Sequence, residues 1–490
     1  MWSKIWRVSS LKYVAAFLIP LIFVMSINQV LDNDTWFVLA EGRYLVQNGV
    51  HYTDVLTMHE DLDIVVQNYG FAMIFYLIHS IFGAPGLYAM MMVLNFVICF
   101  LIYKICMLLS NKNVNLSLFL MVITDVLLAA GFVVTRAQMV SYVIFMSLIY
   151  VLELYVKTGK IKYLCWLPIL SLLQINLHAS LWWVLSLVVL AYIVDSIKKP
   201  KLHLQGYKTK PLIVAGLMML LSGLINPYGI KMVTYIFTSY GAPGIVGMVN
   251  EMSPFDLRSI FNVFTYVALV CVLGLYIFGN KRLIRVRHLL MLFGFLAIGL
   301  NTIKGLSQFI LVMFFPLALV YKNVKIEGLI DAKVGRNAII LWTGVMTICL
   351  FVAFGVSTAY LIEDHPSDGV VGAVNAIEKS SGGNKGVKVY VGYNNGGYVE
   401  YRGFKPYLDP RAEIFLKGNN GKEDILDEWL DMVRGKMKLD EFLDKYDFDF
   451  LIVDYYHERN LYEIEDDDYN VIYENDDEKI KVYEYIDAKK

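Results

Sequence analysis

The sequence predicts a polytopic α-helical membrane protein of about eleven spans, with an extracytoplasmic α/β domain at its C-terminus. Of its 490 residues, 57% are hydrophobic, and the mean hydropathy is +0.53. Many apolar runs approach the roughly 20 residues that cross a bilayer. Charge divides the chain, because residues 363–490 hold 30 acids and 17 bases, whereas the residues before them hold 14 and 26. We therefore expect a membrane domain over residues 1–361 and an acidic α/β domain over residues 362–490.

Hydropathy places the spans and charge gives their orientation. The predicted spans are residues 11–31, 85–108, 114–133, 140–155, 163–175, 181–197, 211–225, 260–279, 289–300, 307–320 and 338–361. The connections 157–162, 198–210, 281–287 and 322–336 are basic and fall on the side of the N-terminus, which the positive-inside rule assigns to the cytoplasm of a bacterial membrane. The opposite connections carry few bases: Arg43, Arg136, Lys231, Arg258 and Lys304. The C-terminal domain is then extracytoplasmic.

Two surface helices are expected in the first outer loop. Near residues 35–47, Trp36 and Phe37 open a short helical pattern as anchors at the bilayer surface, and Asn48-Gly49 closes it. Residues 67–82 are apolar but too short to cross. If they crossed, the basic connection 198–210 would face outward, so we place them on the outer surface.

The C-terminal domain shows local patterns of strands and helices. Residues 387–391 and 448–453 alternate as strands, and residues 423–443 form an amphipathic helix. Residues 470–473 and 480–485 suit the two strands of a hairpin. Asn394 to Gly397 are a turn or a glycine-rich entry to a helix.

One segment of this domain has two interpretations. Residues 396–415 are rich in aromatic side chains and contain Arg402, Asp409, Arg411 and Glu413. Aromatic faces next to paired acids and bases suit a sugar-binding surface. A loop held by ordinary arginine–carboxylate pairs explains the same residues, and the sequence leaves both open.

Polar residues at the outer ends of the spans form the candidate site. The candidate catalytic acids are Asp34, Asp32 and Asp54; the candidate contacts to a lipid phosphate are Arg136, His178, Lys304, Arg258 and Asn176. Bases hold phosphate through charge-assisted hydrogen bonds, and a carboxylate can take a proton from an acceptor hydroxyl as a general base. Charged groups facing lipid are costly, so their gathering on one face favours an active site there.

Each candidate also has a structural interpretation. Asp34 suits the N-cap of a surface helix. Asp32-Asn33-Asp34 matches a D-x-D pattern that can bind a divalent cation, but so short a pattern recurs by chance, and the metal is left unknown. Arg136 can extend to the interface, and His178 can be a hydrogen-bonded interfacial histidine. Acids near the middle of the spans are nearly absent apart from Asp125, which serves either function or structural pairing.

The sequence resembles the GT-C superfamily of integral-membrane glycosyltransferases, closely over the first 110 or so residues and by topology only over the rest. It is most similar to the bacterial, uncharacterised GT-C-like branch of that superfamily. The resemblance rests on DTWFVLAEGRYLVQNG over residues 34–49, on FGAPGL over residues 82–87, on Asp54 and Arg136, on Asn176 to His178, and on Asn226 to Gly229. Those relatives often carry a His-Glu pair where this chain has Gln67-Asn68, a departure that removes a potential acid or metal ligand.

The resemblance implies transfer of a sugar from a polyprenyl-phosphate carrier to an acceptor on the outer face of the membrane, with inversion and an essential aspartate in the first loop. The expected partners are the carrier, membrane lipid, and a glycan, lipid or protein acceptor of the cell envelope. In this hypothesis Asp34 activates the acceptor, while Arg136, His178 and Lys304 hold the leaving phosphate.

Two other classes stay open. One is an oligosaccharide ligase or polymerase with a diphosphate-linked donor, which needs no carboxylate. The other is a non-catalytic scaffold or transporter, for which internal repeats are expected but not found. The sequence contains no P-loop, so direct use of a nucleotide has no support, and no nucleic-acid partner is expected.

Overall fold

The computed structural model describes residues 8–26, 31, 33–129, 131–197, 207–239, 285–323, 366–464 and 468–486. These residues form two compact units. The helical unit holds the described parts of residues 1–29, 88–229 and 249–362. The mixed unit holds those of residues 30–87, 230–248 and 363–490. The mixed unit therefore combines the first predicted outer loop with the C-terminal residues.

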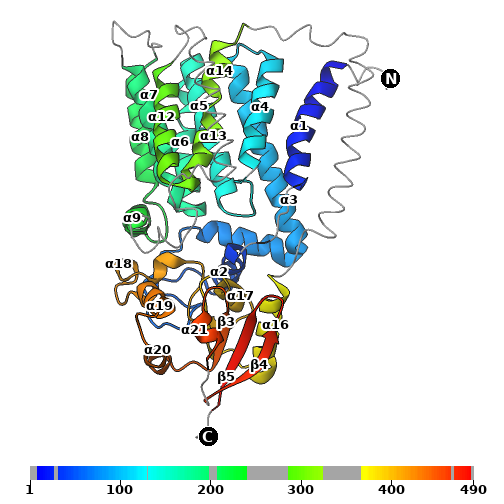
Figure 1. Cartoon of the computed structure of the whole chain (residues 1–490). Helices are drawn as coiled ribbons and strands as arrows, with labels where there is room; N and C mark the ends of the chain where they lie inside the picture. The colour runs from blue at the N-terminus through cyan, green and yellow to red at the C-terminus, as the bar shows by residue number, and fades with distance from the viewer. Residues whose placement is uncertain are drawn as a thin grey trace. The chain divides into compact units, whose positions relative to one another are not determined.

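Apolar helices that run side by side make up the helical unit (Figure 1). They are α1 (Val8–Ser26), the part of α3 (Tyr69–Leu109) from Tyr88 onward, α4 (Val114–Ala129), α5 (Gln138–Thr158), α6 (Trp166–Leu177), α7 (Trp182–Ser196), α8 (Thr209–Ser222), α12 (Val286–Asn301), α13 (Leu306–Val312) and α14 (Phe315–Val320). Four helical stretches among the described residues are long and apolar enough to span a membrane, and four shorter helices are also apolar. The chain is an integral membrane protein by this criterion, whereas a count of eleven spans is not shown. The predicted spans 260–279 and 338–361 lie outside the described residues.

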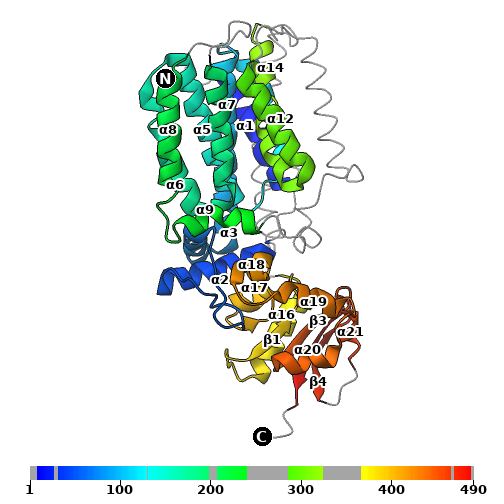
Figure 2. The ribbon, with the colours of Figure 1, turned by 90° about the vertical axis from the view of Figure 1, so that its left-hand side faces the viewer.

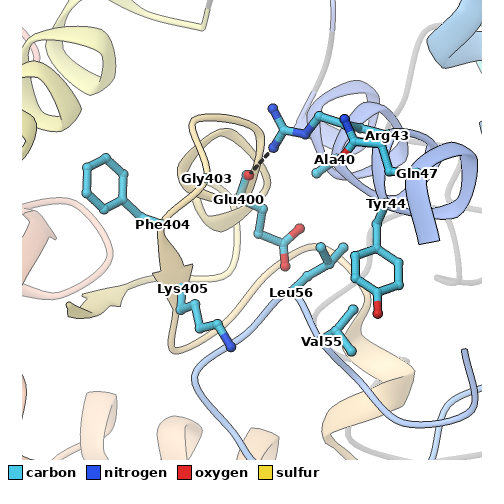
Figure 3. A pocket seen from close by; sticks show the side chains of 10 residues that line it. All are labelled: Ala40, Arg43, Tyr44, Gln47, Val55, Leu56, Glu400, Gly403, Phe404 and Lys405. Atoms are coloured by element: carbon cyan, nitrogen blue, oxygen red, sulfur yellow. Dashed lines mark hydrogen bonds between the residues drawn. The ribbon is translucent and has the colours of Figure 1, made fainter. Parts of the chain in front are cut away.

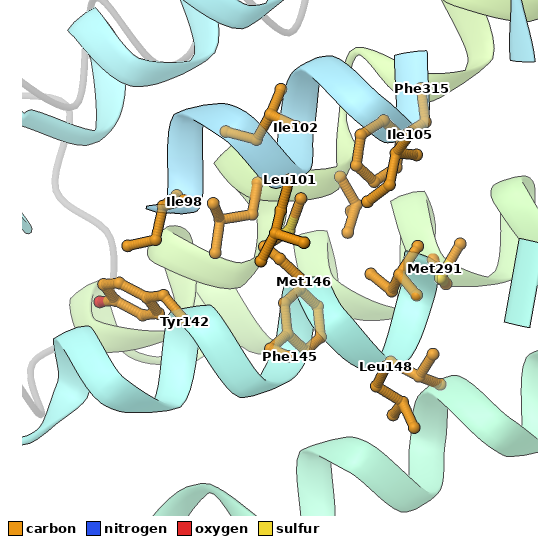
Figure 4. Close-up of a cluster of buried hydrophobic side chains, with 14 of the residues drawn as sticks. Ile98, Leu101, Ile102, Ile105, Tyr142, Phe145, Met146, Leu148, Met291 and Phe315 are labelled. Carbon is orange, nitrogen blue, oxygen red and sulfur yellow. The ribbon is translucent and has the colours of Figure 1, made fainter. Parts of the chain in front are cut away.

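The core of the helical unit is made of interlocking aliphatic and aromatic side chains from several helices (Figure 4). Ile98 and Ile102 of α3 are fully buried with Met146 of α5. Phe145 meets Phe295 of α12 edge to face, with ring centroids 5.5 Å apart. Lipid tails are as apolar as these side chains, so close packing, rather than escape from water, holds such helices together.

Helix α3 is interrupted at Gly83, which has φ 63° and ψ −162°. A side chain at this backbone conformation is strongly disfavoured, and Pro85 follows two residues later, so the sequence FGAPG breaks the helix here. The arm before the break starts at Tyr69, close to the predicted start of the second surface helix. Its place at a bilayer surface stays a prediction.

The mixed unit contains a five-stranded sheet in the order β2-β1-β3-β5-β4. The strands are β1 (Lys388–Val391), β2 (Lys405–Pro406), β3 (Phe450–Asp454), β4 (Tyr469–Asn475) and β5 (Ile480–Tyr485). β1 pairs in parallel with β2 and β3, whereas β5 is antiparallel to β3 and β4. The predicted strands at 387–391 and 448–453 and the predicted hairpin are therefore confirmed.

Helices complete the mixed unit. They are α2 (Asn33–Asn48), the first arm of α3, α9 (Ile230–Ser239), α16 (Asp368–Ser380), α17 (Gly396–Tyr401), α18 (Lys417–Asn420), α19 (Ile425–Val433), α20 (Leu439–Tyr446) and α21 (Arg459–Tyr462). Helix α16 packs against β4 and β5, and Figure 2 shows α19, α20 and α21 beside the strands. The glycine-rich segment is the start of α17, so it is a helix entry.

The single helix predicted over residues 423–443 is wrong, because the structure has two helices there. Helix α19 ends in a Schellman motif at Gly435, which has φ 72°. The Gly435 amide donates to Met432 O (3.0 Å) and the Lys436 amide to Asp431 O (2.8 Å). The apolar pattern of the two helices continues across this turn, which is why periodicity alone joins them.

Within the mixed unit, α2 lies between α17 and the first arm of α3. Trp36 is only 1% exposed and meets the rings of Tyr398 and Tyr401 at centroid distances of 5.2 and 5.1 Å. The prediction that Trp36 anchors α2 at the bilayer surface is therefore wrong. Its ring is buried against the C-terminal residues, whose folding onto α2 the local sequence does not reveal.

Candidate functional site

A buried guanidinium in the mixed unit gathers carboxylates from distant parts of the chain. Arg411 Nη2 lies 3.0 Å from Asp54 Oδ1, 3.0 Å from Glu400 Oε1 and 2.6 Å from Asp409 Oδ2. Its Nη1 lies 3.3 Å from Glu41 Oε2. We name these five residues the Arg411 cluster. All five are buried, so the guanidinium and its carboxylates interact in a medium of low dielectric constant.

Local structure fixes each member of the Arg411 cluster. Glu41 belongs to α2 and Glu400 to α17. Asp54 follows α2 in a turn, where its Oδ2 accepts from the Thr57 amide (2.9 Å) and hydroxyl (2.6 Å). Asp409 Oδ1 accepts from the Arg411 amide at 2.6 Å, which aims its carboxylate at the adjacent guanidinium. The cluster therefore joins three separate segments of the mixed unit.

His51 extends the Arg411 cluster on the side of Glu41. Its Nε2 lies 2.6 Å from Glu41 Oε1 and its Nδ1 lies 2.8 Å from Thr53 O. Burial lowers the pKa of His51, but the hydrogen bond and the charge of Glu41 outweigh burial, so the pKa is raised. His51 is thus a second cation for the cluster when it is protonated.

The acids of the cluster are shifted in opposite directions. Burial acts to raise the pKa of Asp54, but the charge of Arg411 and the hydrogen bonds from Thr57 prevail and lower it. Burial and the charge of Asp409 raise the pKa of Glu400 well above its ordinary value. Asp54 is therefore ionised near pH 7 and is a weak base. A carboxylate with both oxygens engaged suits structure better than proton abstraction.

The contacts of Arg402 and Glu413 fit the loop interpretation of residues 396–415. Arg402 pairs with Glu378 and donates to Asn375 Oδ1 at 2.9 Å. Glu413 Oε1 accepts from Gln67 Nε2 at 2.8 Å. Gln67 occupies the position where the sequence departs from the GT-C-like pattern. In this chain it serves to hold the C-terminal segment.

The structure leaves Asp34 outside the Arg411 cluster. Asp34 lies in the first turn of α2, where a negative charge is favourable to the helix dipole, and it is half-buried. It precedes Glu41 by two helical turns, so the two acids share a face of α2 roughly 10 Å apart. The roles predicted for Asp34 and Asp54 stay predictions. Asp32 lies outside the described residues.

Two of the predicted phosphate contacts, His178 and Lys304, come together in the helical unit. His178 ends α6, where its Nδ1 lies 2.7 Å from Ser141 Oγ and its Nε2 lies 2.7 Å from Ser180 Oγ. Lys304 lies close enough to interact electrostatically with this ring. Both nitrogens of His178 have hydroxyl partners, so a phosphate would have to displace a serine to bind the histidine.

The other predicted phosphate contacts have different surroundings. Asn176 Nδ2 donates to Leu172 O (2.7 Å) and Ile225 O (3.0 Å), which ties the end of α6 to the segment that follows α8. Arg136 is half-buried in the turn between α4 and α5. Arg258 lies outside the described residues. The roles of these residues stay predictions.

Among the described residues, no group of three or more His, Cys, Asp or Glu side chains is arranged to hold a metal ion. In the Arg411 cluster a guanidinium occupies the centre of the acids, where it offers several donors to carboxylates at once.

Comparison with known proteins identifies the fold. No protein-family model and no curated protein matches the chain. The structure is similar to an oligosaccharyltransferase of Archaeoglobus fulgidus, with a TM-score of 0.58 and 11% identity over 94% of this chain and 71% of that one. It is also similar to the arabinofuranosyltransferase AftD from mycobacteria, with a TM-score of 0.52 and 11% identity over 98% of this chain and 40% of that one. The chain has a GT-C-like fold. It spans less than half the length of the mycobacterial protein.

The helical unit of this GT-C-like fold holds a buried ionic network that the sequence analysis missed. Arg287 Nε lies 2.7 Å from Glu153 Oε1 and its Nη1 lies 2.9 Å from Asp195 Oδ2. Tyr192 and Tyr207 donate to these two acids at 2.8 and 3.1 Å. Glu153 and Asp195 fall near the ends of the predicted spans 140–155 and 181–197. The signal in the sequence that could have revealed this network is the presence of an acid in each of two predicted spans.

Asp125 itself has a buried polar neighbour in the same unit. Asn95 Nδ2 donates to Asp125 Oδ2 at 3.4 Å, and both residues are fully buried. This contact links α3 to α4. It favours structural pairing as the role of Asp125.

Proposed function

We propose that the chain is a membrane glycosyltransferase that moves a sugar from a polyprenyl-phosphate carrier to an acceptor of the bacterial cell envelope. The observation that carries the proposal is the GT-C-like fold, whose similarity to an oligosaccharyltransferase extends over 94% of the chain. The acidic first loop adds support, because a carboxylate held in a fixed helix suits proton abstraction. Helix α2 is such an element, since α17 and the first arm of α3 enclose it.

In the proposed mechanism, Asp34 takes the proton of the acceptor hydroxyl. The oxygen of that hydroxyl attacks the anomeric carbon of the sugar at the same time. The bond from that carbon to the phosphate oxygen breaks, and its electron pair leaves with the phosphate. Lys304, His178 and Arg136 are proposed to stabilise the growing charge, with Arg258 and Asn176 as further contacts to the carrier. Asp32 and Asp54 are proposed to support Asp34. Phosphate is a good leaving group, so this step needs no acid.

The test is Asp34→Asn in the full chain, purified and reconstituted with polyprenyl-phosphate sugars and envelope acceptors. Loss of the general base should lower kcat by about 10²- to 10⁴-fold. Asp440→Asn is the matched control, because Asp440 is also an acid in the first turn of a helix of the mixed unit. Equal activity of the two variants would contradict the role of Asp34. Activity of Asp34→Asn with a diphosphate-linked donor would instead support a ligase.

A further inference from the structure

The mixed unit contains a small pocket between α2, the turn after it and the start of β2 (Figure 3). Its volume is about 150 Å³. The lining residues are Ala40, Arg43, Tyr44, Gln47, Val55, Leu56, Glu400, Gly403, Phe404 and Lys405. Sites that enclose a whole small-molecule ligand measure roughly 300–1,000 Å³. This pocket is therefore sized for one unit of a larger molecule.

The charged side chains of the pocket favour an anion. Arg43 from α2 and Lys405 from β2 supply two cations, and Lys405 is exposed. The one acid in the lining, Glu400, turns Oε1 to Arg411 at 3.0 Å. This oxygen of Glu400 therefore already faces a cation within the Arg411 cluster.

Neighbouring contacts hold two lining side chains in place. Arg43 Nη2 donates to Glu400 O at 3.2 Å, and its guanidinium lies 5.8 Å from the ring centroid of Tyr401. The ring of Tyr44 meets the ring of His51 edge to face at 4.9 Å. A ligand therefore meets donors that are already oriented, which lowers the entropy lost on binding.

The remaining lining is apolar or neutral. Val55, Leu56 and Phe404 offer apolar surface, and Gln47 is an exposed amide beside them. A sugar ring has both apolar C–H faces and hydroxyl groups, so a wall of this kind suits it. A carboxylate or phosphate on that ring would accept a hydrogen bond from Lys405.

We propose that this pocket binds an acidic sugar unit, one that carries a carboxylate or a phosphate, within the acceptor glycan. The inference rests on the proposed function, because it names the acceptor class of that enzyme. The ammonium of Lys405 holds the oxyanion, and Arg43, Tyr44 and Gln47 border the ring.

Binding is tested by saturation-transfer NMR on the full chain in detergent, carrying Asp34→Asn so that no transfer occurs. The probes are glucuronate, glucose 6-phosphate, glucose and inorganic phosphate. The two acidic sugars should bind more tightly than glucose and phosphate. Lys405→Gln should weaken both by about tenfold, the size of one charge-assisted hydrogen bond, and Lys405→Arg should restore binding.

Lys379→Gln is the matched control, because Lys379 is an exposed lysine of α16 outside the pocket. Equal binding by Lys405→Gln and Lys379→Gln would overturn the proposal. So would glucose binding as tightly as glucuronate, or inorganic phosphate binding as tightly as glucose 6-phosphate. If the acidic sugars bind but the wild-type chain transfers no sugar, the binding proposal is supported while the proposed function fails.

Discussion

Arg411 illustrates how one side chain organises its surroundings. Arginine presents five N–H donors in a planar fork, so it can meet several carboxylates at once, whereas the ammonium of lysine is a compact point charge. Glu41, Asp54 and Asp409 all lie within reach of this guanidinium. The identity of residue 411 is therefore as important as its charge.

Arg411→Met should destabilise the mixed unit strongly. Removing one partner of a buried ion pair leaves uncompensated charge and costs about 3–5 kcal/mol. Arg411→Lys should recover part of this loss. Hydrogen exchange of α2 and α17 in the full chain measures the effect, with the exposed Arg434→Met as control. Equal protection in Arg411→Met and Arg434→Met would show that the cluster contributes little.

Glu458 gives the mixed unit a dependence on pH. Burial raises its pKa to about 7, against the hydrogen bond that Tyr390 donates at 2.7 Å. The folded state thus binds the proton more tightly than the unfolded state does. The contribution of Glu458 to the free energy of unfolding is greatest below pH 4.5 and falls as the pH rises toward 7. Above pH 7 this contribution no longer changes with pH.

Glu458→Gln should remove this dependence of stability on pH. At pH 8 the variant should be more stable than the wild type by up to roughly 3 kcal/mol, because one pKa unit corresponds to about 1.4 kcal/mol. At pH 4.5 the gain should vanish. Hydrogen exchange of residues 450–464, corrected for intrinsic rates, measures the difference. The exposed Glu463→Gln is the control, and an unchanged pH slope in Glu458→Gln would contradict the assignment.

At the scale of elements, two glycines allow the close packing of α2. A Cβ at Gly42 would lie 2.1 Å from Ala72 O of α3. A Cβ at Gly397 of α17 would lie 2.9 Å from Asn33 O. Both obstacles are backbone atoms, which cannot rotate away as a side chain can. Gly42 and Gly397 thus allow α3 and α17 to approach α2 closely on two sides.

Gly42→Ala should displace α2 and lower the stability of the mixed unit by about 1–3 kcal/mol, the usual cost of overpacking. Gly418→Ala is the control, because a Cβ at Gly418 meets nothing within 4 Å. Limited proteolysis of the full chain compares the two variants. Identical cleavage of the segment that follows α2 would show that the neighbouring helix accommodates the methyl group.

Local patterns predicted elements well and their ends less well. The strands β1, β3, β4 and β5 followed from alternation and turn residues over a few positions. The break between α19 and α20 did not, because Gly435 interrupts a helix-like pattern without changing its apolar face. The burial of Trp36 did not follow from local patterns either, since its neighbours Tyr398 and Tyr401 are remote in sequence.

At the scale of the whole molecule, each unit has a buried arginine that binds acids from separate elements. In the helical unit, Arg287 is 2% exposed and links α12 to α5 and α7 through Glu153 and Asp195. Buried polar side chains add directed contacts to packing among apolar helices. The network therefore holds three helices at defined positions.

Arg287→Met should lower the thermal stability of the full chain in detergent, because Glu153 and Asp195 lose their cation in a buried site, at a cost of about 3–5 kcal/mol. Lys160→Met is the control, since Lys160 is exposed at the end of α5. Combining Arg287→Met with Glu153→Gln and Asp195→Asn should restore part of the loss. A melting temperature equal to that of Lys160→Met would contradict a stabilising role.

The sequence was sufficient for the class of the molecule but not for its charge pairs. Hydropathy and the change in charge near residue 362 predicted a membrane protein with an α/β domain. The pairing of Glu41 with Arg411 joins residues 370 positions apart, and no local pattern reports such a contact. For the same reason, the candidate acids could be named from the sequence while their partners could not.

The pairing of Glu41 with Arg411 also has a consequence for biosynthesis. At 5–20 residues per second, on the order of 20 to 70 seconds separate the synthesis of the two residues. During that interval Glu41 and Asp54 lack their cation, and Trp36 lacks the tyrosines that cover it. The nascent chain thus carries an unfinished domain while later helices are made, and a chaperone or the insertion machinery would have its opportunity to bind there.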